Sequence, residues 1–138
     1  MKIYYREKSG GIEILRCFGI EGRVEIPGMI DGKLVISAVP YAFSSHMDEK
    51  EDLKNASLWE VSDGLEFGRE EHVLAGNDVE EIVFPYTLKE IGRYIFYGCG
   101  NLKKLEFSDS LMQIGCGAFT GCHALEKLTV HMRQGKKS

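Results

Sequence analysis

A pattern of 23 residues is written twice in this sequence and constrains what the chain can fold into. The segments 79–101 and 102–124 are identical at seven of their 23 positions, and 125–130 begins a third copy. The identities pair Phe84 with Phe107, Leu88 with Leu111, Ile91 with Ile114, Gly92 with Gly115, Phe96 with Phe119, Gly98 with Gly121 and Cys99 with Cys122. A unit of this length cannot bury its own apolar face, so the copies must stack and share one core.

Apolar spacing predicts the shape of each unit. Leu105 and Phe107 lie two apart, so they share the inner face of a short strand, while Lys104 and Glu106 point outward. The remaining recurrent positions predict a second side and a closed corner, with Leu111 and Ile114 on the side and Phe119 and Cys122 in the corner.

These residues resemble a known family. The pattern L-x-x-L-x-F … L-x-x-I-G-x-x-A/I-F-x-G-C is similar to the BspA-type leucine-rich repeats of bacteria, closely over 79–130 and partially over 24–43. The resemblance implies a right-handed solenoid with a parallel sheet and short turns, and a role in binding proteins or ligands without catalysis. The expected fold class is therefore α/β but β-rich, with about four coils and an N-terminal β-hairpin cap.

The chain is expected to form a single domain over 1–138. Two alternating runs around a Ser9-Gly10-Gly11 turn predict a hairpin within 1–23, which would cover the first coil. A first repeat with an acidic insertion occupies 24–55, followed by a degenerate repeat at 56–78, full repeats at 79–101 and 102–124, and a last strand and tail at 125–138.

The degenerate repeat keeps the 23-residue spacing of several apolar core positions but lacks the sequence motif of the full repeats. Subtracting 23 from the next copy gives apolar residues at five core positions, but glycine at two others, Gly68 and Gly76. The five are Ala56, Trp59, Val61, Leu65 and Val73. A short helix over 49–59, with Asp48 as N-cap and Glu51 completing a capping box, is the alternative, and the two structures are compatible.

The sequence contains no recognisable catalytic motif or metal-binding motif. The spacing of Cys99 and Cys122 differs from that of zinc sites, and the repeat places them in equivalent corners about 5 Å apart. A disulfide would fit that distance, but a cytoplasmic location disfavours it. No hydrolase, phosphate-loop or zinc-protease motif is found. We expect no enzyme, no cofactor and no metal.

Charge and hydropathy limit the partners. The formal net charge is −4, with 17 basic and 21 acidic residues, so there is no basic surface for nucleic acid. Arg6, Glu7 and Lys8 interrupt the N-terminus before any signal-peptide run, and no stretch is long enough for a membrane helix. We therefore expect a cytoplasmic protein that does not bind nucleic acid or membranes.

The outward strand positions are the candidate partner-binding surface. They form columns across neighbouring coils, and their charges either fix the strand register on a solvated face or contact a protein partner. Three tyrosines of one coil also point outward, and aromatic residues are enriched at interfaces. The candidates are Glu81, Val83, Lys104, Glu106, Lys127, Tyr86, Tyr94 and Tyr97.

The last strand predicts an open end. Leu125, Leu128 and Val130 would be covered on one side only, and an edge strand carries unpaired backbone groups. These residues are the candidate edge of a homodimer. The expected function is a non-catalytic protein-interaction module. The alternative is a structural or self-assembling unit of a larger protein, and the remote one is an enzyme with an unrecognised site.

Overall fold

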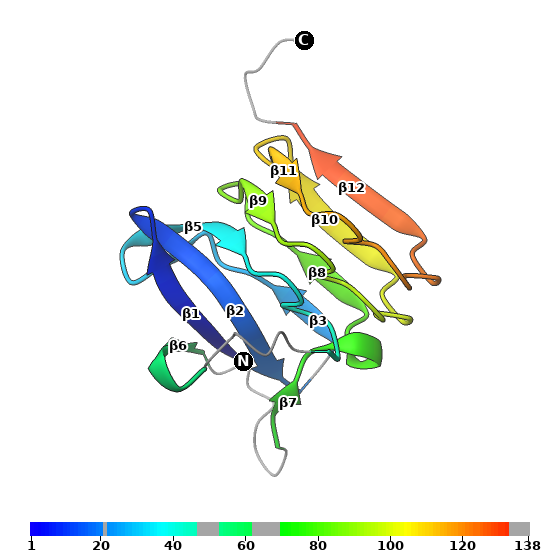
Figure 1. The fold of residues 1–138 in the computed structure, drawn as a ribbon, viewed down its shortest axis with the longest axis horizontal. Helices are drawn as coiled ribbons and strands as arrows, with labels where there is room; N and C mark the ends of the chain where they lie inside the picture. The colour runs from blue at the N-terminus through cyan, green and yellow to red at the C-terminus, as the bar shows by residue number, and fades with distance from the viewer. Residues whose placement is uncertain (21, 47–52, 62–69, 133–138) are drawn as a thin grey trace.

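The computed structural model describes residues 1–20, 22–46, 53–61 and 70–132. Within them the chain forms twelve strands and two short 3₁₀ turns, which form a stack of coils (Figure 1). The elements are β1 (Lys2–Lys8), β2 (Gly11–Gly19), β3 (Arg23–Glu25), β4 (Met29–Ile30), β5 (Lys33–Ala38), η1 (Leu53–Asn55), β6 (Ser57–Glu60), β7 (His72–Val73), η2 (Gly76–Asp78), β8 (Glu81–Val83), β9 (Glu90–Ile91), β10 (Lys104–Ser108), β11 (Gln113–Ile114) and β12 (Lys127–His131).

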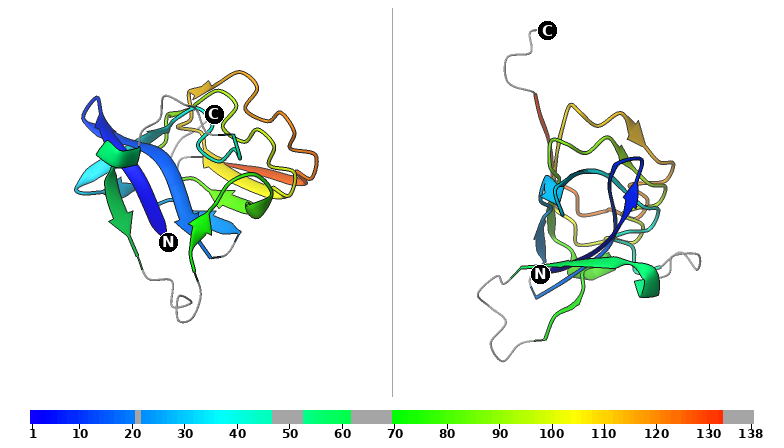
Figure 2. Two further views of the ribbon diagram at one scale, coloured as in Figure 1. Left: turned by 60° about the horizontal axis from the view of Figure 1, so that its bottom comes forward. Right: turned by 90° about the vertical axis from the view of Figure 1, so that its left-hand side faces the viewer.

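The first side of the coils is a parallel sheet in the order β12-β10-β8-β3. Its register confirms the period of 23, because Lys104 pairs with both Glu81 and Lys127. Leu105 is fully buried and Lys104 is exposed, as the alternation predicts. Successive coils lie behind one another when the molecule is seen from its N-terminal side (Figure 2, right).

The second side also carries parallel pairs, β2 with β5, β5 with β9 and β9 with β11. Ile91 is buried between Ala38 and Ile114, with which it is paired in register. Ile114, on β11, is 52% exposed because none of the described residues covers its outer side.

Phenylalanines fill the predicted corner. Phe43, Phe96 and Phe119 form a ladder with ring centroids 6.2 and 5.7 Å apart. The corner cysteine closes each turn, since Cys99 N–H donates to the Phe96 carbonyl (3.0 Å) and its thiol donates to the Phe43 carbonyl (3.2 Å). The repeated F-x-G-C motif is thus a structural corner.

The N-terminal hairpin is confirmed as a hairpin, with β1 antiparallel to β2. β2 pairs with β1 on one edge and with β5 on the other, and almost all of its residues are buried. Two of them are charged. Glu13 accepts hydrogen bonds from Arg6 and Ser37 (2.9 and 3.0 Å), and Arg16 donates to the Ser44 carbonyl (2.6 Å). These partners satisfy groups whose burial would otherwise be unfavourable.

The degenerate repeat predicted at 56–78 is wrong. β3 pairs directly with β8, so no strand from this segment enters the stack between them. Instead β6 pairs antiparallel with β1, and β7 with β2. The hairpin has unpaired backbone groups along its edges, and these short strands hydrogen-bond to them. The segment lacks the full set of apolar residues that would stabilise it as a coil of the stack. Of the five predicted core residues, Ala56 and Trp59 are half-buried, Val61 and Val73 are exposed, and Leu65 lies outside the described residues.

The helical alternative over 49–59 is also wrong where the structure describes it. Residues 53–55 form a 3₁₀ turn and 57–60 a strand, whereas Asp48 and Glu51 lie outside the described residues. The frame itself returns at Gly76, whose N–H donates to the Phe43 carbonyl (2.8 Å) as Cys99 does to Phe96. The described residues between Phe43 and Gly76, which are 44–46, 53–61 and 70–75, therefore belong to an excursion inside one coil.

The whole is a β-rich solenoid with little helix. No α-helix occurs among the described residues, so the α part of the predicted class is wrong there. The structure has about five turns, where about four were expected, when the partial turns at both ends of the described chain are counted. The turns consist of β2, β3 with β5, β8 with β9, β10 with β11, and β12. The described part contains no helix long and apolar enough to span a membrane.

Candidate functional site

The outward face of the first sheet carries the predicted columns. Arg23, Glu81, Lys104 and Lys127 lie in register in one column. In the other, Val83 lies between Glu25 and Glu106. Arg23 extends the first column in a way not anticipated from the sequence, and its guanidinium lies 3.5 Å from the Glu81 carboxylate.

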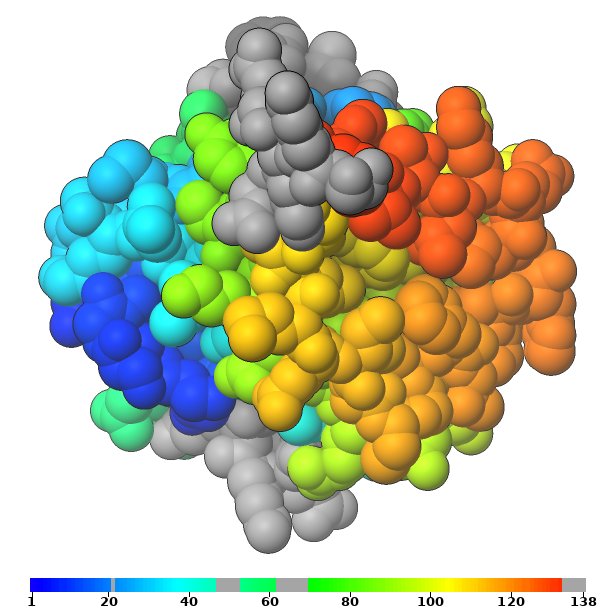
Figure 3. All heavy atoms as spheres, turned by 90° about the horizontal axis from the view of Figure 1, so that it is seen from above, coloured from blue at the N-terminus to red at the C-terminus, as the bar shows by residue number. Residues whose placement is uncertain are grey.

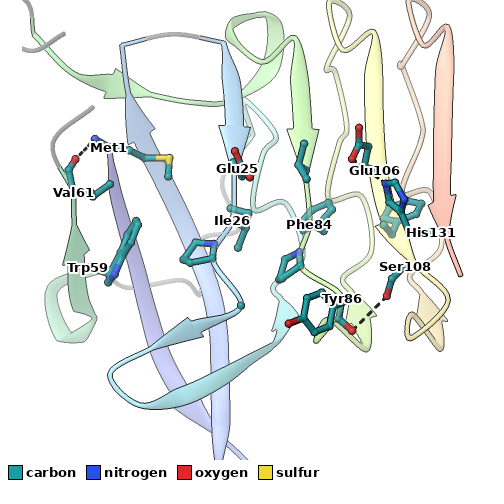
Figure 4. Close-up of a pocket in the computed structure, with 15 residues that line it drawn as sticks. Met1, Glu25, Ile26, Trp59, Val61, Phe84, Tyr86, Glu106, Ser108 and His131 are labelled. Atoms are coloured by element: carbon teal, nitrogen blue, oxygen red, sulfur yellow. Dashed lines mark hydrogen bonds and ion pairs between the residues drawn. The ribbon is translucent and has the colours of Figure 1, made fainter. Parts of the chain in front are cut away.

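A groove of about 630 Å³ lies at the end of this sheet (Figure 4). We call it the sheet-end groove, and it is lined by Met1, Glu25, Ile26, Pro27, Gly28, Trp59, Val61, Val83, Phe84, Pro85, Tyr86, Glu106, Phe107, Ser108 and His131. Its volume is within the range of ligand pockets, and such pockets combine apolar walls with a few polar groups. Val83, Glu106 and Tyr86 were predicted as contact residues and are brought together here.

One wall of the groove comes from the excursion. The pairing of β6 with β1 positions Trp59, on β6, and Val61, directly after it. Both face the ends of β3 and β8 (Figure 4). Trp59 was predicted as core of a coil and is instead a half-buried groove residue. The position of Trp59 depends on pairing with β1, which is distant in the sequence. The local periodicity of the sequence does not predict this pairing.

The polar groups of the groove lie along its rim. His131 Nε2 is 3.1 Å from Glu106 Oε2, within hydrogen-bond distance. Glu25 receives a hydrogen bond from Arg23 (3.0 Å). Both carboxylates stand beside the apolar floor of Ile26 and Phe84, which gives the groove an amphipathic lining.

The three predicted tyrosines do not form one patch. Tyr86, 74% exposed, lies in the sheet-end groove, while Tyr94 and Tyr97 line a separate hollow of about 360 Å³ with Tyr41 and His46. We call this second hollow the tyrosine slot. The separation arises because Tyr86 follows the strand and Tyr94 precedes the corner, on different sides of the same coil.

Two residues of the slot have strained backbones. Tyr41 and Tyr94 adopt φ of 62° and 53°, in the left-handed region. A side chain there costs roughly 1–2 kcal/mol relative to glycine. The copy at 102–124 has Gly117 at the position equivalent to Tyr94, with φ of 67°. The sequence carried this signal, because the period aligns Tyr94 with a glycine.

The thiols are poor nucleophiles where they are buried. Burial raises the pKa of Cys17 and that of Cys99 to about 12, and it also raises the pKa of Cys122. Cys116 is exposed. Across the described ranges no cluster of three or more histidine, cysteine or acidic residues could hold a metal ion.

The candidate dimer edge is open in the described chain. β12 pairs with β10 on one side, and Leu128 and Val130 are each 51% exposed. Leu125 is half-buried against the core. Figure 3 shows these last coils, yellow to red, gathered at one end of the molecule and the blue hairpin at the other.

Comparison with known proteins identifies the repeats and the fold. Residues 70–136 match the family model described as a BspA type leucine rich repeat region (6 copies). The structure is similar to a leucine rich repeat protein from T. pallidum, with a TM-score of 0.66 and 23% identity over 91% of this chain and 46% of that one. It is also similar to a leucine rich cell surface protein from Faecalibacterium prausnitzii A2-165, with a TM-score of 0.59 and 18% identity over 92% of this chain and 30% of that one. The search of curated proteins gave no significant match. The chain thus spans less than half the length of both solved neighbours.

Proposed function

We propose, from the premise that residues 70–136 are a BspA-type leucine-rich repeat region, that this chain is a non-catalytic protein-interaction module. The sheet-end groove is its contact surface. The observation that carries this proposal is the meeting, in one hollow, of Trp59, Tyr86 and the outward column of Glu25, Val83 and Glu106.

The lining of the groove suits a protein partner. Tryptophan and tyrosine dominate the binding energy of interfaces, and the most important residues lie in well-packed central pockets. Trp59 and Tyr86 stand on different elements of the groove (Figure 4) and so can hold a partner side chain from two directions. The carboxylates of Glu25 and Glu106 at the rim add charge selectivity more than affinity.

The first prediction compares two exposed tyrosines. Tyr86→Ala is expected to weaken binding of a partner by about tenfold or more, since an aromatic anchor is lost. Tyr97→Ala, an exposed tyrosine outside the groove, is expected to leave that binding unchanged. Partners captured from the native cell would be identified by mass spectrometry, and affinities measured by calorimetry. Equal effects of the two substitutions, or no effect of Tyr86→Ala, would contradict the assignment of the groove.

The second candidate function is self-assembly through β12. Leu128, Val130 and Met132 are exposed apolar residues on or beside an edge strand, which readily pairs with another chain. A two-fold interface of this kind would let two copies of β12 pair with each other. The hairpin of β1 and β2 would then serve as the cap at the other end of the stack.

Light scattering behind size exclusion tests self-assembly. A homodimer at micromolar concentration is expected, and Leu128→Lys should convert it to a monomer by placing a charge in the apolar contact. Thr129→Lys adds the same charge to the opposite face of the same strand and should leave the dimer intact. A wild-type chain that stays monomeric as its concentration rises would reject this candidate.

A further inference from the structure

We propose that the tyrosine slot binds a small organic cation whose nitrogen carries alkyl groups, such as a quaternary ammonium. This site goes beyond the protein-binding function, because none of its described lining residues belongs to the sheet-end groove. It is formed by Tyr41, His46, Tyr94 and Tyr97, which come from two successive coils.

The backbone conformation of Tyr41 and Tyr94 points to a role for these rings beyond packing. Gly117 shows that glycine fits the shared left-handed position without strain, yet the two preceding coils hold Tyr41 and Tyr94 there. Bulky residues in this conformation are true outliers. Such outliers concentrate at ligand sites, where the surrounding structure holds them in place.

The rings surround a common space. Tyr41 and Tyr94 are stacked, with centroids 5.6 Å apart and planes 17° from parallel. Tyr97 stands at 79° to Tyr94 and His46 at 65° to Tyr41, so each end of the stacked pair meets a steeply inclined ring. A cation is attracted within about 6 Å of a ring centroid. Because neighbouring centroids are 5.3–6.0 Å apart, one cation in the hollow can contact several rings.

The lining selects the class of ligand. Among the residues that the structure describes, it contains four aromatic rings and no lysine, arginine or carboxylate, so these residues offer an anion no lysine or arginine partner. The chain has a formal net charge of −4. This charge favours cations. Alkyl groups on the nitrogen suit the slot because they can contact the faces of the rings. A bare ammonium fits less well, since ring faces cannot replace the hydrogen bonds of its hydration shell.

A titration with choline tests the chemistry. In the full chain, choline should give saturable shifts of the tyrosine ring signals in NMR spectra. Its neutral isostere, 3,3-dimethylbutan-1-ol, should bind at least about tenfold more weakly, since it keeps the shape and loses the charge. Equal binding of both probes would show an apolar hollow without cation selectivity, and absence of saturable shifts would show no site. Either result would overturn the proposal.

Variants locate the binding in the slot. A Cβ atom at position 117 would lie 2.2 Å from Cε1 of Tyr94, so Gly117→Ala displaces that ring without changing a lining side chain. We expect it to weaken choline binding about tenfold. Gly10→Ala is the matched control, because Gly10 has φ of +80° and nothing within 4 Å of an added Cβ, and choline binding should be unchanged.

A third variant protects the test against misfolding. Tyr97, 44% exposed, can be removed without opening the core, so Tyr97→Ala should abolish choline binding in a folded chain. Retained choline binding in this variant would overturn the proposal. Tyr86→Ala should bind choline normally, which separates failure of the slot from failure of the groove. Phosphatidylcholine vesicles, with free choline as competitor, would show whether the cation comes from a lipid headgroup or a free molecule.

Discussion

Replacing Phe96 by alanine is expected to lower the free energy of unfolding by about 3–5 kcal/mol, the usual cost of truncating a buried phenylalanine. Phe96 is fully buried and lies at the centre of the aromatic ladder. Its ring centroid is 6.2 Å from that of Phe43, 6.1 Å from Phe84 and 5.7 Å from Phe119. The substitution would leave a cavity between three rings held by stacked backbones, which cannot collapse to fill it.

Phe119→Ala is the matched control, since it removes the same ring from the next coil. Phe119 is only half-buried, so its loss should cost roughly 2 kcal/mol or less. Urea unfolding of both variants measures the difference. Equal losses of unfolding free energy would mean that Phe119 is packed as tightly as Phe96. That result would contradict the partial exposure of Phe119 in the structure.

The repeat was predictable because its signal is local and periodic. The register of Glu81, Lys104 and Lys127 follows from spacing alone, since a shift of one residue would turn Leu105 out of the core. The corner is equally legible, because Phe96 and Cys99 recur at fixed offsets from the strand. These features confirm the solenoid across the second half of the chain.

The excursion was not predictable in the same way. Gly76 does occupy the corner position that the frame assigns to it, but β6 and β7 leave the stack between Phe43 and Gly76 to pair with the hairpin. Antiparallel pairing to a distant edge depends on which backbone groups are left free by the rest of the fold. A period counted along the chain contains no such information, so the wall that Trp59 gives to the groove was missed.

The tyrosines show a partial success of sequence reasoning. The frame placed Tyr86, Tyr94 and Tyr97 outward, and all three contribute to hollows at the surface. Their common membership of one coil concealed that the coil has several sides. Tyr41 was not identified, although its place two residues before the corner phenylalanine matches that of Tyr94.

The glycine that follows the second-side isoleucine controls how closely the coils approach. A Cβ atom at Gly92 would lie 2.2 Å from the Pro40 nitrogen and 2.6 Å from the Val39 carbonyl carbon, both in the backbone of the preceding coil. Gly115 meets the backbone of Arg93 in the same way, at 2.2 Å. Backbone atoms cannot move aside as a side chain can, and here they are fixed by the hydrogen bond from Gly92 N–H to the Ala38 carbonyl (2.9 Å).

Gly92→Ala is therefore expected to lower the free energy of unfolding by about 3 kcal/mol, at the upper end of the usual cost of overpacking. Gly28→Ala is the control, because an added Cβ there makes only ordinary contacts, the nearest 3.7 Å from Pro85. That variant should stay within about 0.5 kcal/mol of the wild type or gain slightly from a less flexible unfolded chain. Urea unfolding of both variants provides the measurement. If Gly92→Ala proved as stable as Gly28→Ala, neighbouring coils could separate without loss, and the recurring glycine would have to be explained by its turn instead of by coil contact.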